Sequence, residues 1–286
     1  NPFVSHFLLK AMKKTNFKGK FLLFWHADII KQKFFKLFFL SQNKALLKRA
    51  DLIFATSPNY LKDTDYLPLY HDKVEILPLC IGKERENINS SILKKKEEIK
   101  EENKGKKIGF FFGRHVSYKG LKYLIQSDSF LDREKIEIYI AGEGPLTKKL
   151  KRQAKPFSNI HFLGKLTEED INAYLLACDV FLFPSITRNE AFGISLAEAL
   201  SFAKPAVTFS IKGSGVNFVS LNKVTGEEVK NKDSFAYAKA IEDVLKEENY
   251  PKYCLNAKKR ADALFTRSLF EKNVLNIYGS LLGEKK

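Results

Sequence analysis

Cysteine is scarce in this chain of 286 residues, and the three present lie far apart, at Cys80, Cys178 and Cys254. This spacing excludes a disulfide-rich scaffold, and the lack of a C-x-x-C pair argues against a thiolate zinc site. No apolar run reaches the roughly eighteen residues that a membrane-spanning helix needs. A hydrophobic share of 44% excludes wholesale disorder. The sequence therefore predicts two globular domains in a reducing cytoplasm.

Acidic residues are nearly absent from the first fifty positions, where eleven Lys or Arg face the single acid Asp28. Basic residues interleaved with Phe suit either nucleic acid or an anionic bilayer, and a solvated lysine-rich face explains the pattern equally well. No RNP, KH or helix-turn-helix signature is present, so we expect no nucleic-acid partner. We expect contact with an anionic membrane through Lys13, Lys14, Lys18 and Lys20, beside Phe17 and Phe21.

Short apolar runs alternate with helical patterns along most of the chain. Such runs are typical of strands buried on both faces of a parallel sheet. We expect strands at 21–25, 52–55, 74–77, 108–112, 136–140, 160–163, 180–183 and 206–209. We expect helices at 2–13, 31–49, 119–127, 145–154, 194–202, 233–247, 251–264 and 267–283, and after caps at Ser57 and Thr167. The predicted fold class is α/β, with two doubly wound sheets.

Residues 84–106 interrupt this alternation, because they are rich in Lys, Glu and Asn and have little apolar periodicity. We interpret this stretch as an interdomain linker that includes a charged helical piece. It separates a first domain over residues 1–83 from a second domain over residues 107–266.

The sharpest motif is the E-x7-E segment from Glu190 to Glu198, which follows a predicted strand and opens a helix. Backbone N–H groups at such a helix start bind anions under the positive end of the helix dipole. Gly193 lets a ligand approach the backbone closely, and Glu198 is placed to accept hydrogen bonds from hydroxyls. A solvated helix start would show the same residues, so this segment alone does not decide between the two.

Two further strand ends carry glycine and charge, at 113–120 and at 141–145. Arg114 and Lys119 are placed to converge on one anion, the first as a planar fork and the second as a point charge. Three such turns at the carboxyl ends of strands in one sheet predict a ligand that bears phosphate. The P-loop and the G-x-G-x-x-G fingerprint are both absent from the sequence, which excludes those two phosphate-binding motifs.

Taken together, these motifs resemble the family-4 retaining glycosyltransferases of the two-Rossmann (GT-B) type, over essentially the whole chain. Smaller matches to the same family lie at 161–164, 184–185, 204–205 and 224–226. The segments at 25–29, 55–60 and 213–216 are similar to the bacterial members that build surface polysaccharides, including mannosyl- and rhamnosyltransferases. The motifs are specific as a set and weak singly.

The resemblance implies transfer of a hexose from a nucleotide-diphosphate sugar to a glycan or lipid-linked acceptor, as in lipopolysaccharide synthesis. It places Arg114 and Lys119 at the leaving diphosphate and Glu190 near the reacting centre of the sugar. Glu198 would hold the ribose hydroxyls. His26 would face the donor sugar from the first domain, with a structural histidine as the alternative. Further donor contacts are expected from Gly142, Gly164, Leu166, Phe192, Gly193 and Ile194.

The resemblance also implies that no metal or other cofactor takes part. Arg114, Lys119 and the helix start would stand in for a metal at the leaving diphosphate. Asp63-Thr64-Asp65 has the D-x-D spelling of a metal site, but it falls in a predicted helix far from the other motifs. We interpret these two aspartates as surface residues.

A complete family member begins with a strand and a Gly-rich loop, and nothing in this chain corresponds to them. The chain opens on Asn1-Pro2 without Met, so we expect a fragment whose acceptor-side domain is incomplete. Its first sheet would expose an edge strand. We expect such a fragment to bind donor but to turn over poorly or not at all. A helix within residues 267–286 is expected to pack back on the first domain.

Two other functions stay open from the sequence. One is a non-catalytic GT-B-like module that docks on a membrane or a partner enzyme through its basic N-terminal region. The other is a sugar-nucleotide epimerase of the same fold, although Arg114 and Lys119 with the E-x7-E segment fit transfer better. A transferase of this kind is expected in the cytoplasm, and as a peripheral protein at the inner face of the plasma membrane.

Overall fold

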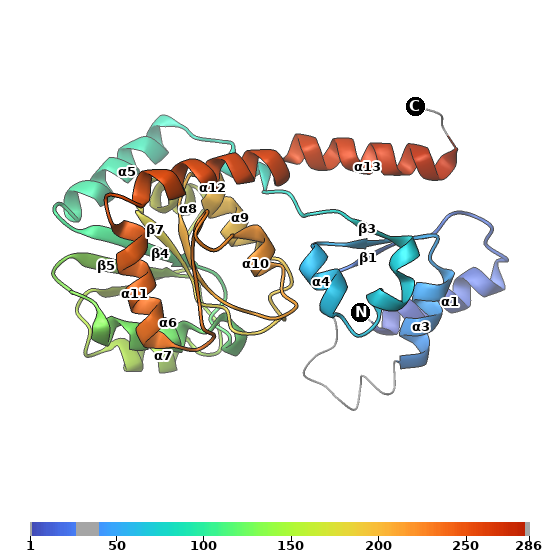
Figure 1. Cartoon of the computed structure of the whole chain (residues 1–286), viewed down its shortest axis with the longest axis horizontal. Coiled ribbons are helices and arrows are strands. Elements are labelled where there is room, and N and C mark those ends of the chain that lie inside the picture. The colour runs from blue at the N-terminus through green and yellow to red at the C-terminus, as the bar shows by residue number, and fades with distance from the viewer. Residues whose placement is uncertain (1, 27–39, 284–286) are drawn as a thin grey trace.

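The chain forms two parallel sheets, each with its own helices (Figure 1). This computed structural model describes residues 2–26 and 40–283. The α/β class and the two parallel sheets predicted from the alternating pattern are confirmed, and most elements begin or end within two residues of their expected positions.

The first sheet has three strands, in the order β1-β2-β3. They are formed by Leu22–Trp25, Leu52–Ala55 and Val74–Ile76. The elements around the sheet are α1 (Pro2–Lys14), α3 (Leu40–Arg49), α4 (Pro58–Asp63) and the 3-10 helix η1 (Leu67–Lys73). Part of the helix predicted at 31–49 lies outside the described residues, and its described part is α3. Trp25, Leu47 and Ile53 belong to a small separate core.

The second sheet has six strands, in the order β6-β5-β4-β7-β8-β9. The strands are Lys107–Phe112 (β4), Ile136–Ala141 (β5), Ile160–Gly164 (β6), Val180–Phe183 (β7), Ala206–Phe209 (β8) and Gly226–Val229 (β9). Every residue of β7 and β8 is buried, as expected for continuous apolar runs. The sequence missed β9, because its residues include two glutamates. The strand order reverses between β4 and β7, where open α/β sheets bind their ligands.

Nine helices complete the described chain. They are α5 (Ser90–Glu102), α6 (Leu121–Ser127), α7 (Thr147–Ala154), α8 (Glu168–Ala177), α9 (Ile194–Ser201), α10 (Val216–Val219), α11 (Ser234–Leu245), α12 (Tyr250–Leu264) and α13 (Arg267–Leu282). Two predicted caps are confirmed. The Ser57 side chain accepts from the Tyr60 N–H at the start of α4. Thr167 and Asp170 form a capping box at α8.

The charged helical piece predicted within residues 84–106 is confirmed as α5, and its inner face packs into the second core rather than standing apart as a linker. Helix α5 lies beside the second sheet (Figure 1), and Ile92 and Ile99 on its inner face are buried in the core of that sheet. Lys100 of α5 also forms an ion pair of 3.3 Å with Asp179, just before β7. The apolar side chains were too sparse for the sequence to show this face, yet two well-placed isoleucines fix the helix.

Helix α13 extends α12 towards the first part of the chain (Figure 1). Its start is capped by Thr266, whose side chain accepts from the Leu269 N–H. None of its described residues is buried, and Leu275 is 70% exposed. Packing of this helix on the first domain therefore stays a prediction. None of the helices over residues 2–26 and 40–283 has the length and apolar character needed to cross a bilayer.

Candidate active site between the two sheets

A cavity of about 750 Å³ opens at the carboxyl ends of β4 and β7, where the strand order of the second sheet reverses. Residues of both sheets line it, so the site is shared between the two parts of the chain. The lining residues are His26, Thr56, Leu79, Phe112, Lys119, Asn189, Glu190, Ala191, Phe192, Gly193, Ile194, Ser195 and Glu198. The E-x7-E segment and Lys119 are thus brought together, as the sequence predicted.

Lys119 and Glu190 form the charged centre of this cavity. The Lys119 Nζ lies 2.5 Å from Glu190 Oε2, and both side chains are nearly buried. The Ser185 hydroxyl donates to the same carboxylate oxygen at 3.2 Å. The Lys119 Nζ also lies 4.8 Å from the centre of the Phe183 ring, at the end of β7. An ammonium group held in this way keeps a fixed position, which is what stabilisation of a leaving anion requires.

The start of α9 supplies backbone N–H groups to the same cavity. Gly193 stands just before the helix with φ of 94°, a left-handed conformation that favours glycine. Ile194 and Ser195 follow in the first turn, where N–H groups have no partner within the helix. Phe192 anchors the loop by packing edge-on against Phe265. This turn can therefore bind an anion beside the Lys119 ammonium.

The segment 213–216 supports the loop that carries Glu190 through two hydrogen bonds. The Ser214 hydroxyl donates to the Glu190 carbonyl oxygen, and the Gly215 N–H donates to the Ala191 carbonyl oxygen at 2.8 Å. The Ser57 hydroxyl oxygen lies 3.1 Å from where a side chain on Gly215 would begin. This segment thus lies between the start of α4 and the site loop, and it supports the loop without lining the cavity.

Glu198 is buried in the first turns of α9 and faces Arg85, which comes from the segment that connects the two sheets. The Arg85 Nε lies 3.3 Å from Glu198 Oε1, in an ion pair without hydrogen-bond geometry. Arg85 also donates to Glu168 and Asn172 at 2.5 and 2.6 Å. Burial raises the pKa of Glu198, and the charge of Arg85 opposes this shift. The Glu198 carboxylate is therefore held in place by a residue outside the second sheet.

His26 and Thr56 reach the cavity from the first sheet, where they follow β1 and β2 directly. Desolvation lowers the pKa of His26 from its ordinary value of 6.5, so the imidazole is neutral at pH 7. Its ring stacks on Phe24 at 5.9 Å. Thr56 is buried, and its hydroxyl has no hydrogen-bond partner within the described chain. Both groups can hydrogen-bond to a polar ligand in the cavity.

Four of the predicted donor-binding residues do not line this cavity. Arg114 is exposed on the loop after β4, so its convergence with Lys119 on one anion stays a prediction. Gly142 follows β5, Gly164 is the last residue of β6 and Leu166 comes shortly after it, all at the same edge of the sheet. The Gly142 N–H donates to the Gly164 carbonyl at 2.6 Å, and a side chain on Gly142 would begin 2.1 Å from the Gly113 carbonyl oxygen. Only glycine fits that close contact.

Asp65 is exposed and Asp63 is half-buried, which agrees with the interpretation of both as surface residues. Arg188, beside the site loop, donates to the Asp63 carbonyl oxygen at 2.6 Å and pairs with Asp65 at 3.4 Å. These contacts connect α4 to the second part of the chain. Within the two described ranges, no three His, Cys, Asp or Glu side chains gather as a metal site would require. Metal independence stays a prediction.

We did not predict from the sequence that Arg85, Asn189 and the Thr56 hydroxyl belong to the site. Arg85 lies in the stretch that we interpreted as a linker, where charged side chains are expected to be exposed to solvent. Thr56 was noticed only within the segment 55–60. The one available signal was its place directly after a buried strand, since parallel strands end at a common edge.

The sequence matches the family described as Glycosyl transferases group 1 over residues 94–261. It is 31% identical over 264 residues to O-antigen chain mannosyltransferase C of Escherichia coli. The aligned region covers 91% of this chain and 69% of that protein. It is 30% identical over 244 residues to D-rhamnosyltransferase WbpZ of Pseudomonas aeruginosa. The aligned region covers 84% of this chain and 61% of that protein. The chain thus spans about two thirds of the length of these relatives.

Solved structures share the fold. HepE of Anabaena, in complex with UDP and glucose, aligns with a TM-score of 0.79 at 16% identity, over 98% of this chain and 76% of that one. WaaG, a glycosyltransferase involved in lipopolysaccharide biosynthesis, aligns with a TM-score of 0.68 at 18% identity, over 93% and 79%. These likenesses confirm the predicted GT-B fold. Together with the two relatives and the match over residues 94–261, they show that the chain belongs to the glycosyl transferases group 1 family.

Proposed function

We propose that the protein is a retaining hexosyltransferase that uses a nucleotide-diphosphate sugar and acts on a glycan or lipid-linked acceptor in surface-polysaccharide synthesis. The observation that carries the proposal is the Lys119–Glu190 ion pair, beside the start of α9, in a cavity at the point where the strand order reverses. The names of the mannosyl- and rhamnosyltransferase relatives support the reaction class, and the HepE complex with UDP supports a nucleotide donor.

In this proposal the leaving diphosphate lies between the Lys119 ammonium, the N–H groups of Ile194 and Ser195, and Arg114 from the loop after β4. Breaking the glycosyl–phosphate bond leaves negative charge on the diphosphate, and preorganised positive groups stabilise it without reorganising during the step. Lys119 would exchange its Glu190 partner for phosphate oxygens, since Glu190 is then needed at the sugar. No step requires a metal.

Glu198 would accept hydrogen bonds from the ribose hydroxyls, and the backbone at Gly164 and Leu166 would lie by the base. Arg85 keeps the Glu198 carboxylate pointing in one direction. His26 and Thr56 would contact the donor sugar or the acceptor from the opposite wall. A neutral His26 suits this place, because an imidazole without charge both donates and accepts hydrogen bonds.

Peripheral membrane contact is a further part of the proposal. Helix α1 exposes Phe7 and Leu8, at 66% and 40%, next to its basic last turn. Phe17, at 45% exposed, packs beside Arg49, whereas Phe21 packs against the first core. Exposed aromatic side chains among lysines favour an anionic bilayer surface. The transferase is preferred to the docking module and the epimerase because the named relatives are transferases.

The test is a calorimetric titration of the chain with UDP, GDP, dTDP, CDP and ADP. We expect one of them to bind, and at 100 times its dissociation constant it should add about 2.7 kcal/mol to the free energy of unfolding. Lys119→Met should weaken that binding by about tenfold or more, because a buried cation is lost from the diphosphate. Lys104→Met, in the exposed turn after α5, is the matched control and should bind like the parent chain.

Binding of none of the five nucleotides would contradict the proposal, and so would unchanged affinity in Lys119→Met. Transfer itself is followed as release of nucleoside diphosphate from the donor sugar, and the anomeric configuration of the product is assigned by proton NMR. An inverted product would overturn the retaining mechanism.

A further inference from the structure

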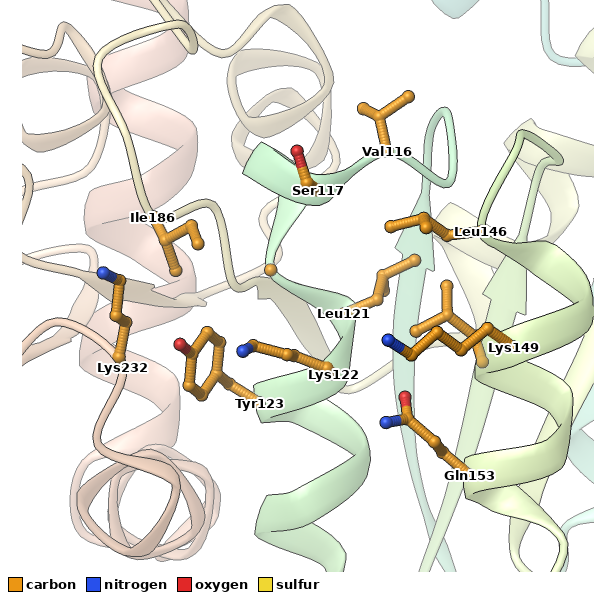
Figure 2. Close-up of a pocket in the computed structure, with 12 residues that line it drawn as sticks. Val116, Ser117, Leu121, Lys122, Tyr123, Leu146, Lys149, Gln153, Ile186 and Lys232 are labelled. Carbon is orange, nitrogen blue, oxygen red and sulfur yellow. The ribbon is translucent and has the colours of Figure 1, made fainter.

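A second cavity, of about 360 Å³, lies in the second domain (Figure 2). It is formed between α6, α7 and the loop after β7, and it shares no lining residue with the active-site cavity. Its lining residues are Val116, Ser117, Gly120, Leu121, Lys122, Tyr123, Leu146, Lys149, Leu150, Gln153, Ile186 and Lys232. The proposed function gives this cavity no role.

Apolar side chains form one wall of this pocket. Leu121 and Leu150 are buried, and Leu146 and Ile186 are half-buried at its edge. The Ile186 N–H donates to the Tyr118 carbonyl oxygen at 2.9 Å, which fixes the loop after β7 against the turn before α6. The wall is therefore built into the domain, and it can exclude water from a short hydrocarbon segment.

Three lysines surround the same space, and none of the described lining residues is acidic. Figure 2 shows Lys149 and Gln153 projecting from α7 towards α6, while Lys122 and Lys232 lie on either side of Tyr123. The Lys122 Nζ is 4.5 Å from the centre of the Tyr123 ring. Within the described chain, acidic side chains pair with many lysines but with none of these three. Their charge is left for a ligand.

Helix α7 extends this positive surface. Its eight residues include Lys148, Lys149, Lys151 and Arg152 and no acid, and no ion pair of the described chain involves these four. Several exposed lysines elsewhere on the second domain are paired with acids three or four residues away, as Lys135 is with Asp132. A cluster of unpaired cations beside an apolar wall is complementary to an anion that carries a hydrocarbon group.

We propose that this pocket binds a lipid phosphate, with the phosphate between Lys122, Lys149 and Lys232 and the first carbons of the chain against Leu121, Leu146 and Ile186. A phosphate monoester carries nearly two negative charges at pH 7, which suits several ammonium groups better than one carboxylate would. The volume accommodates the head and a short apolar segment, so the remainder of a long chain would leave through the open side. This site is separate from the donor site and does not depend on the identity of the donor.

The test is a calorimetric titration of the chain with octyl phosphate below its micelle concentration, alongside inorganic phosphate and octanol as separate probes. We expect octyl phosphate to bind about tenfold or more tightly than either fragment, because both parts of the pocket contribute. Saturating UDP should leave this affinity unchanged. Inorganic phosphate binding as tightly as octyl phosphate would overturn the lipid assignment in favour of a free phosphate site.

The triple variant Lys122→Gln, Lys149→Gln, Lys232→Gln should weaken octyl phosphate binding by about tenfold or more. Its matched control carries Lys94→Gln, Lys104→Gln and Lys135→Gln, which remove the same charge from three exposed lysines elsewhere. Gln153→Glu is a second probe, because it adds a carboxylate at the rim and should also weaken binding. Equal affinity in the triple variant and its control would overturn the proposal, and so would competition by UDP. An unchanged midpoint of urea unfolding, measured by circular dichroism, shows that the triple variant is folded.

Discussion

The two sheets of this protein differ in how completely they are buried. In the second sheet, β7 and β8 are covered on both faces and every residue is buried. In the first sheet, β1 is mostly half-buried, and Phe24 on it is 38% exposed. The second sheet thus has a core that can hold a rigid site, whereas the first has only a small core.

This difference matches the division of the active-site cavity. The charged groups that line the cavity, Lys119, Glu190 and Glu198, all come from the second domain. The first sheet contributes His26 and the Thr56 hydroxyl, which carry no charge at pH 7. A buried charge needs fixed partners to be tolerable, and here Lys119 pairs with Glu190 while Arg85 from the connecting segment pairs with Glu198.

The largest expected effect tests whether the two cores unfold separately. Leu182→Ala in β7 and Leu47→Ala in α3 each remove a fully buried side chain, and each should lower the free energy of unfolding by about 3 to 4 kcal/mol. Trp25, the only tryptophan of the sequence, lies in the first core. In urea, Leu47→Ala should shift the unfolding midpoint that tryptophan fluorescence measures. Leu182→Ala should instead shift the midpoint of the circular dichroism transition that belongs to the second core. Equal shifts of both signals in both variants would show one cooperative unit.

The next largest effect is expected when the connection between the two parts of the chain is broken. Arg85→Met should lower the free energy of unfolding by about 3 kcal/mol, because it leaves the buried Glu198 carboxylate without its partner. Chemical denaturation measures this loss, and Glu198→Met in the same chain should recover much of it. Arg267→Met, which breaks an exposed pair on α13, is the control and should change stability by less than about 0.5 kcal/mol. A loss as small as that of the control would mean that Arg85 does not hold Glu198.

A smaller effect concerns the first sheet alone. Thr56→Val replaces a buried hydroxyl that has no hydrogen-bond partner with a methyl group of the same shape. The free energy of unfolding should rise by about 1 kcal/mol, because an unsatisfied polar group is removed from the interior. The tryptophan fluorescence midpoint in urea measures the gain. A loss of stability would show that the hydroxyl already has a partner, such as a bound water.

The smallest effect is a dependence on pH that belongs to Glu198. Burial raises the pKa of Glu198 above its ordinary value of 4.5, so the folded chain holds this proton more tightly than the unfolded chain. The contribution of Glu198 to stability is therefore greatest below pH 4.5 and is lost as pH rises through the raised pKa. Glu198→Gln removes it, so the difference in stability between variant and parent should grow over that window. A flat difference between the two proteins would contradict the shift.

Local sequence was sufficient for many of the elements. The Thr167 capping box depends on residues three positions apart, and the apolar strands depend on consecutive residues, so both can be predicted without knowledge of the rest of the chain. The meeting of Lys119 with the E-x7-E segment followed from the rule that parallel strands end at one edge. Strand β9 was missed because its glutamates hide a burial that only its place beside β8 explains.

Contacts between distant segments were beyond this reasoning. Helix α5 looked like a linker because only Ile92 and Ile99 reveal its buried side. The place of Arg114 away from the cavity, and the contacts of Arg188 with α4, depend on how loops turn after the strands end. Side-chain direction in such loops is decided by packing from several elements at once.

The sequence by itself determined that short apolar strands would form parallel sheets and that glycine turns with charge would gather at their carboxyl ends. Those features depend on alternation, caps and backbone freedom, all of which act between near neighbours. Only the tertiary structure decided that Arg85 from the connecting segment would hold Glu198, and that three lysines would surround a second pocket. The physical reason is that charges act through space, and separation along the chain does not tell which of them become neighbours.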